Sequence, residues 1–216
     1  MNEGKTVEGI EGMEYITSGL SGDQLEDHMN SMMYEYEDQV VYAALELRAE
    51  WVTDSNNSTS LAMEKYVAEF MELEYAHYNN SENNHMVILT KEQKEAIIAI
   101  YDVTQRLLSG KNITHVVVYR GFSWSDRPDW VNERLGEGEN IQIDEQRTLS
   151  SWSFSREVAV GFVSHNNFGF VVKASMPIER IFAIIDITME SESVCVSFDK
   201  KEEFEVVFIK GGERCE

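Results

Sequence analysis

The spacing of apolar residues changes near Gly110, and this change constrains the fold more than any other feature of the sequence. Before Gly110, apolar residues recur every three or four positions, which is typical of amphipathic helices. After it, short runs rich in branched and aromatic residues follow one another, as in strands. Helices first and strands later favour an α+β fold over an alternating α/β sheet.

Three helical stretches are predicted within residues 21–110. The first covers residues 21–51 as one helix or two, the second ends near residue 78, and the third ends at Gly110. Ser21–Gln24 and Thr90–Gln93 both have the form of a capping box, which starts a helix. Residues 1–20 contain four glycines and no sustained period, so we expect a flexible arm there.

Residues 111–216 are predicted to form a β-rich core that contains one short helix, Arg156–Val163. The predicted strands cover residues 116–119, 146–154, 168–174, 181–187 and 204–209. The chain is therefore divided into an arm (1–20), a helical N-terminal part of the domain (21–110) and a β-rich core (111–216).

The charge of the chain excludes several functions. The 39 acidic and 18 basic residues give a net charge of −21, and residues 1–110 alone hold 21 acidic and 6 basic residues. Such a surface repels phosphate backbones and anionic lipids, so neither direct nucleic-acid binding nor membrane binding is expected. The acidic half is interpreted either as a solvated surface or as one that attracts a basic partner, such as a nucleic-acid-binding protein.

The sequence carries no pattern typical of export or of metal binding. The sequence has no apolar run of membrane-spanning length and no signal-peptide pattern at its start, so we expect a cytoplasmic protein. Cys195, Cys215 and the five histidines do not have metal-ligand spacing, so no metal is expected.

Two polar patterns interrupt the predicted strands between residues 116 and 154. Arg120 and Gly121 follow a β run, which places a fork-shaped cation beside backbone that a ligand can approach, as suits a phosphate or pyrophosphate. Ser151 and Ser153 flank Trp152, and alternation along a strand puts both hydroxyls on one face.

A third pattern lies near the end of the chain. Glu203 and Glu205 flank Phe204, so both carboxylates are expected on one face at the start of an apolar strand. Each of the three patterns alone is common on protein surfaces. Their order and their flanking residues carry more information than any one of them.

Together these patterns resemble the arginine–serine–glutamate class of mono-ADP-ribosyltransferases, which includes actin-modifying toxins and enzymes of T-even-like phages. The resemblance covers residues 113–212. The quoted segments are similar to the aromatic-Arg-Gly, Ser-Thr-Ser and Glu-x-Glu motifs of the family, with a small residue and a phenylalanine downstream of the serines: Tyr119-Arg120-Gly121, Ser151-Trp152-Ser153, Ala159, Phe162, Glu203-Phe204-Glu205 and the closing Gly211-Gly212. Trp152 replaces the usual threonine.

The resemblance implies a split β-sandwich with a cleft for NAD, the co-substrate. It implies transfer of ADP-ribose from NAD to arginine side chains of a target protein, with release of nicotinamide. In this scheme Arg120 neutralises the pyrophosphate, the Gly121 backbone holds the nicotinamide carboxamide and Phe162 packs on the nicotinamide ring. Ser151 holds the catalytic glutamate, and Ser153 supports the strand.

The resemblance also divides the roles of the two glutamates. Glu205 stabilises the oxocarbenium-like transition state, and Glu203 orients the acceptor guanidinium. The loop 190–201 is then the acceptor-recognition loop. Three alternatives remain open from the sequence: an NAD glycohydrolase, a non-catalytic acidic protein that binds basic surfaces, and a β-sandwich in which Arg120 and Glu205 simply pair.

Overall fold

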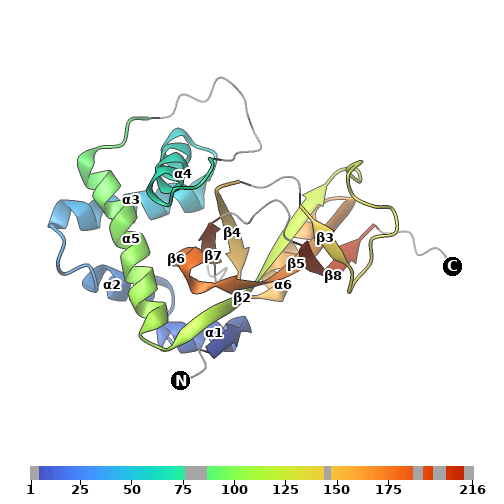
Figure 1. Ribbon diagram of the computed structural model, residues 1–216, viewed down its shortest axis with the longest axis horizontal. Helices are drawn as coiled ribbons and strands as arrows, with labels where there is room; N and C mark the ends of the chain where they lie inside the picture. Colours follow the sequence, from blue (N-terminus) through green and yellow to red (C-terminus); the bar gives the residue numbers. More distant parts are fainter. Residues whose placement is uncertain (1–4, 76–86, 144–146, 187–191, 197–202, 212–216) are drawn as a thin grey trace.

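The computed structural model describes residues 5–75, 87–143, 147–186, 192–196 and 203–211, and it has a mixed α+β fold (Figure 1). The helices are α1 (Gly9–Thr17), α2 (Gly22–Ser31), α3 (Asp38–Thr53), α4 (Ser58–Phe70), α5 (Lys91–Ser109) and α6 (Arg156–Val163). The strands are β1 (Lys5–Glu8), β2 (Ile113–Trp124), β3 (Asn140–Gln142), β4 (Leu149–Ser153), β5 (Phe168–Pro177), β6 (Ile181–Ile185), β7 (Glu192–Val196) and β8 (Glu203–Lys210). Helices α2 to α5 gather at one end of the molecule, and β3 and β8 lie at the other (Figure 1).

The two predicted capping boxes have different outcomes. At α5 the prediction is confirmed: the Thr90 hydroxyl accepts from the Gln93 backbone and the Gln93 side chain accepts from the Thr90 backbone. At α2 the Ser21 side chain makes no capping hydrogen bond. The carboxylate of Asp186, at the end of β6, instead accepts from the Gly22 backbone N–H at 3.1 Å. An anion at this place also interacts favourably with the helix dipole.

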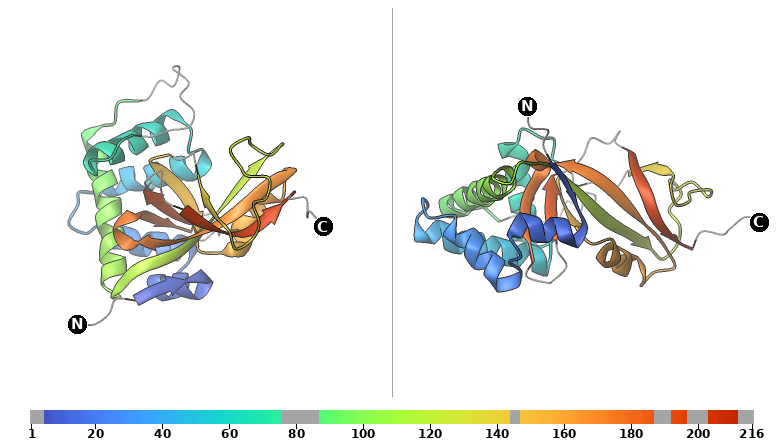
Figure 2. Two further views of the ribbon diagram at one scale, coloured as in Figure 1. Left: turned by 45° about the vertical axis from the view of Figure 1, so that its right-hand side comes forward. Right: turned by 90° about the horizontal axis from the view of Figure 1, so that it is seen from below.

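The expected flexible arm over residues 1–20 differs from the structure, because residues 5–17 form β1 and α1. Strand β1 pairs in parallel with the first half of β2. Val7, Met13 and Ile16 are buried in the main core, and this burial stabilises the segment despite its glycines. Helix α1 lies beside β1 and β2 (Figure 2), and it also contacts α5.

The strands of the described residues form one eight-stranded sheet in the order β3-β8-β5-β2-β4-β7-β6, with β1 beside β2. Neither β3 nor β7 was predicted. Between β2 and β4 the ladder consists of a single pair, Tyr119 with Ser153. The sheet is therefore held together weakly at this point, with β4, β7 and β6 on one side and the long strands β2, β5 and β8 on the other.

The sheet separates two cores of different size. The main core lies between the helices and the sheet, and it includes aromatic side chains such as Phe154, Phe170 and Phe182. A smaller core lies under α6, where Ala159 and Val163 pack on strands β2 and β5. Among the described residues, no helix has both the length and the apolar composition needed to cross a membrane.

Candidate functional site

A pocket of about 210 Å³ lies where β2 meets β4. Five segments form its wall: the end of α3, the turn after it, the segment from Arg147 through β4, the middle of β2 and the helix α6. The lining residues are Trp51, Ser55, Tyr119, Arg120, Gly121, Arg147, Ser151, Trp152, Ser153, Val158, Ala159 and Phe162. The sequence-predicted Arg120, Gly121, Ser151 and Phe162 thus share one pocket.

Strand β2 supplies Arg120 and Gly121. The guanidinium carbon of Arg120 lies 4.8 Å from the ring centroid of Phe122 and 6.0 Å from that of Trp152, both within the range of cation–π attraction. At Gly121 a Cβ atom would lie 2.3 Å from the backbone oxygen of Ala159. Helix α6 therefore packs directly on the strand backbone, and only glycine fits there.

Strand β4 supplies the two serines, which alternate with Trp152 as predicted. Trp152 is buried and its ring lies 5.7 Å from that of Phe204 in the main core. The Ser153 hydroxyl accepts from the backbone N–H of Ser155 at 3.0 Å, and Ser155 in turn caps α6. Ser151 is exposed, so its hydroxyl is accessible from the pocket. The two serines therefore differ in what they contact.

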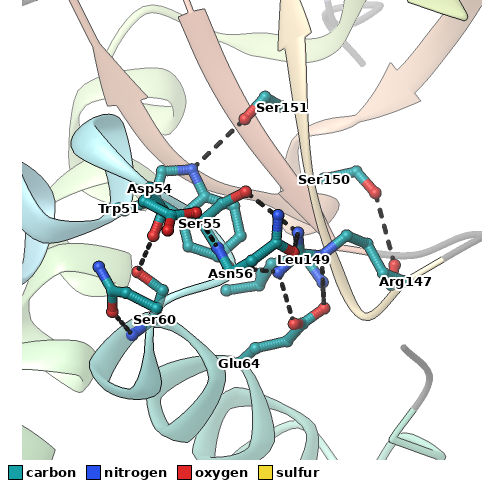
Figure 3. A network of polar contacts seen from close by, with 11 residues as sticks. Trp51, Asp54, Ser55, Asn56, Ser60, Glu64, Arg147, Leu149, Ser150 and Ser151 are labelled. Atoms are coloured by element: carbon teal, nitrogen blue, oxygen red, sulfur yellow. Dashed lines mark hydrogen bonds and ion pairs between the residues drawn. The ribbon is translucent and has the colours of Figure 1, made fainter. Parts of the chain in front are cut away.

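The helical half of the chain contributes a wall that sequence analysis did not predict. Arg147, just before β4, pairs with Glu64 of α4 through two contacts, Nε to Oε1 at 3.1 Å and Nη2 to Oε2 at 2.7 Å (Figure 3). The side chains are 4% and 0% exposed, so this is a fully buried ion pair. Glu64 also accepts from the Leu149 backbone at 2.9 Å. The pair therefore fastens α4 to the start of β4.

Arg147 also fixes the turn between α3 and α4. Its guanidinium donates to the Ser55 hydroxyl at 3.1 Å and to the Ser55 backbone oxygen at 2.9 Å. Its guanidinium carbon lies 5.1 Å from the Trp51 ring centroid. Glu64 gave the available sequence signal, because it shares a helix face with the apolar Leu61 and Ala68, whereas Arg147 follows a polar run and gave none.

Helix α6 closes the pocket on the side opposite these helices. Its Phe162 is 53% exposed at the pocket rim, although it is a large apolar side chain. Ala159 is buried between the helix and Gly121. The family resemblance predicted a role for both residues. In the structure, Ala159 makes a buried contact with Gly121, and Phe162 presents an exposed ring at the pocket rim.

The predicted glutamates lie elsewhere. Neither Glu203 nor Glu205 lines this pocket. Glu203 lines a different cavity of about 340 Å³, together with Lys173 and Arg180. Strand β8, which carries both glutamates, pairs with β3 and β5 and not with β4. The strand order therefore does not place Glu205 beside Ser151, and the expected contact between them stays a prediction.

One row of cross-strand partners across the sheet explains this difference. Its members, in order, are Glu205, Lys173, Tyr119, Ser153 and Glu192. With roughly 4.8 Å between neighbouring strands, Glu205 lies about 14 Å from Ser153, counted along the row. Glu192 is the direct cross-strand partner of Ser153 in the backbone register. The register therefore brings Glu192, and not Glu205, to β4.

Glu192 belongs to a second Glu-x-Glu pattern that sequence analysis missed, Glu190-Ser191-Glu192. The signal was available, because this pattern also precedes an apolar run. The resemblance predicted an acceptor-recognition loop over residues 190–201, whereas residues 192–196 form strand β7. Residues 190, 191 and 197–201 lie outside the described residues.

Behind the pocket, three side chains join β1 to β2 and β5. The Tyr119 hydroxyl donates to Glu8 Oε1 at 2.5 Å, and Lys173 Nζ lies 2.8 Å from the same oxygen. Burial, and then the hydrogen bond to Glu8, raise the pKa of Tyr119. The hydrogen bond from Lys173, and then that from Tyr119, lower the pKa of Glu8. At neutral pH Tyr119 therefore stays protonated and Glu8 stays ionised.

Comparisons with family models, with curated proteins and with solved structures find no match to this chain. Within the part of the chain that the structure describes, no group of three or more His, Cys, Asp or Glu residues could hold a metal ion. The pocket itself combines arginine side chains, an exposed hydroxyl and an aromatic rim. Such a lining suits an anionic ligand that carries a flat ring.

Proposed function

We propose that this protein is a mono-ADP-ribosyltransferase that moves ADP-ribose from NAD to arginine side chains of target proteins and releases nicotinamide. The observation that carries the proposal is the meeting of Arg120, Gly121, Ser151 and Phe162 in one pocket. These residues come from three separate segments, and they were selected from sequence motifs alone. A target with basic surfaces would also complement the acidic helical half.

The shape of the sheet supports the split-sandwich part of the proposal. The strands β4, β7 and β6 are joined to the longer strands by the single pair Tyr119–Ser153. The pocket lies at this junction. In the proposed complex NAD occupies this junction, Arg120 binds the pyrophosphate and the exposed ring of Phe162 packs on nicotinamide.

The chemistry requires a carboxylate near the ribose. The bond between the ribose C1′ and the nicotinamide nitrogen breaks, nicotinamide leaves as a neutral molecule, and positive charge develops on the ribose. A nitrogen of the acceptor guanidinium then bonds to C1′ and loses a proton. We assign the stabilising carboxylate to Glu192, because its strand pairs with β4 at Ser153, and we keep Glu205 of the sequence motif as the alternative. The acceptor-orienting glutamate then becomes Glu190, which lies outside the described residues.

The experiment is an assay with labelled NAD, in which nicotinamide release and label on agmatine are both measured. We expect Glu192→Gln to lower both by about 10² to 10³, the usual effect of losing one preorganised electrostatic group. Glu205→Gln is the matched control, because it makes the same substitution four strands away, and it should keep most of the activity.

Each contrary outcome has a definite meaning. Loss of activity in Glu205→Gln with full activity in Glu192→Gln would return the catalytic role to Glu205. Nicotinamide release without label on any acceptor would identify a glycohydrolase. If the unaltered chain neither binds nor cleaves NAD, the proposal falls and the non-catalytic acidic protein becomes the better interpretation.

A further inference from the structure

Trp51 occupies a central place in the wall that the helices contribute to the pocket. It lies in the last turn of α3 and is only 2% exposed, although it lines the pocket. Its indole Nε1 lies 3.4 Å from Ser151 Oγ, and the Arg147 guanidinium lies over its ring (Figure 3). Trp51 thus contacts the one pocket serine that is exposed.

We propose that Trp51 is a positioning residue that fixes the Ser151 hydroxyl as a hydrogen-bond donor into the pocket. An indole N–H can only donate, so Ser151 Oγ accepts in this pair. The hydroxyl keeps its own hydrogen, which it can then donate to an acceptor in the pocket, either an oxygen of the ligand or a carboxylate. Without Trp51 the hydroxyl could rotate and accept instead.

The surroundings of Trp51 limit its movement. Arg147 stacks on one face of the indole while it is bound to buried Glu64 and to Ser55. The indole of Trp51 therefore packs on Arg147, which the ion pair with Glu64 holds to α4. The 3.4 Å separation from Ser151 is long for a hydrogen bond, and contacts in empty active sites commonly shorten when the ligand binds.

The direct test needs no ligand. In a proton–nitrogen correlation spectrum, the indole N–H resonance of Trp51 is assigned by its loss in Trp51→Phe. Ser151→Ala should shift this resonance and speed its exchange with solvent, because the acceptor is removed. Ser153→Ala is the matched control, since that hydroxyl accepts from Ser155, and it should leave the resonance in place. An unmoved resonance in Ser151→Ala overturns the proposal.

The second test rests on the proposed function and uses NAD. Trp51→Phe keeps an aromatic ring under Arg147 and removes the N–H together with part of the indole volume. We expect Trp51→Phe and Ser151→Ala each to lower kcat/KM for nicotinamide release by about three- to tenfold, the effect of one hydrogen bond. The double variant should be no worse than the more affected single variant, because the two residues act through one interaction.

The two tests separate the two claims. Losses that multiply in the double variant would overturn the positioning role, because a merely structural tryptophan would act independently of Ser151. Trp124→Phe, in an aromatic cluster with Trp130 and Phe170 outside the pocket, should keep the activity of the unaltered chain. If the unaltered chain does not bind NAD, the proposed function fails, and so does the role of Trp51 in positioning Ser151 toward NAD. The spectrum still decides whether the hydrogen bond between Trp51 and Ser151 exists.

Discussion

Gly121 of β2 and Ala159 of α6 approach so closely that a Cβ atom on Gly121 would lie 2.3 Å from the Ala159 backbone oxygen. The helix cannot yield at this point without moving the side of the pocket that carries Phe162. Gly121→Ala should therefore destabilise the protein by about 1–3 kcal/mol, as overpacking does, and should weaken ligand binding as α6 shifts. Chemical denaturation and NAD titration measure the two effects.

Gly161, on the same helix, provides the control. A Cβ atom there meets nothing within 4 Å, and Gly161→Ala should add stability by up to about 1 kcal/mol through helix propensity. Equal behaviour of the two variants would contradict the close packing of α6 on β2.

The buried pair of Glu64 and Arg147 should respond very differently to single and double substitution. Glu64→Gln leaves a buried guanidinium without its counter-charge and should cost about 3–5 kcal/mol. Replacing both residues, as Glu64→Leu with Arg147→Met, removes the uncompensated charge and should recover much of that loss. Urea unfolding of these two variants and of the unaltered chain measures the difference. A double variant that is at least as unstable as Glu64→Gln would contradict this explanation.

The contact between Glu8 and Lys173 should make the docking of β1 sensitive to acid. The pKa of Glu8 lies below its ordinary value of 4.5 in the folded protein, so its contribution to stability is complete above pH 4.5. It is lost as the pH falls from there through the lowered value. The difference in unfolding midpoint between the unaltered chain and Glu8→Gln should therefore shrink below pH 4.5. A difference that is constant with pH would argue against an ionised Glu8 in this contact.

Arg120 should not be replaceable by lysine. An ammonium group cannot reproduce the planar fork that binds two phosphate oxygens, so Arg120→Lys should raise the Kd for NAD about tenfold or more although the charge is kept. Arg127→Lys is the matched control, because Arg127 also stacks on an aromatic ring, that of Phe168, but does not line the pocket. Calorimetry that finds the same Kd for all three proteins would indicate that Arg120 has no part in binding phosphate.

The features that could be predicted from the sequence depend on residues close together in the chain. The capping box of Thr90 and Gln93, and the alternation of Ser151 with Trp152, are set by local geometry. The start of α2 at Ser21 was predicted, but its capping contact was not, because Asp186 caps it from a position 164 residues away. The ion pair of Arg147 with Glu64 was not predicted either, because the two residues are 83 positions apart in the chain.

The choice between two glutamate patterns shows the same limit within the site. Glu203–Glu205 and Glu190–Glu192 look alike in sequence, since each is an alternating acidic pair before an apolar run. Which strand lies beside Ser153 is a property of the sheet order, and periodicity along one strand carries no information about it.

The parallel pairing of β1 with β2 has a consequence for the order of folding. Glu8 and Tyr119 are 111 positions apart, so β1 leaves the ribosome long before its partner strand exists. Contacts between residues so far apart in sequence form late in folding. Until β1 has paired, the edge of β2 can pair with strands of other molecules. Slow docking of β1 should therefore limit the yield of monomer during synthesis, and a chain that lacks this strand should form intermolecular sheets.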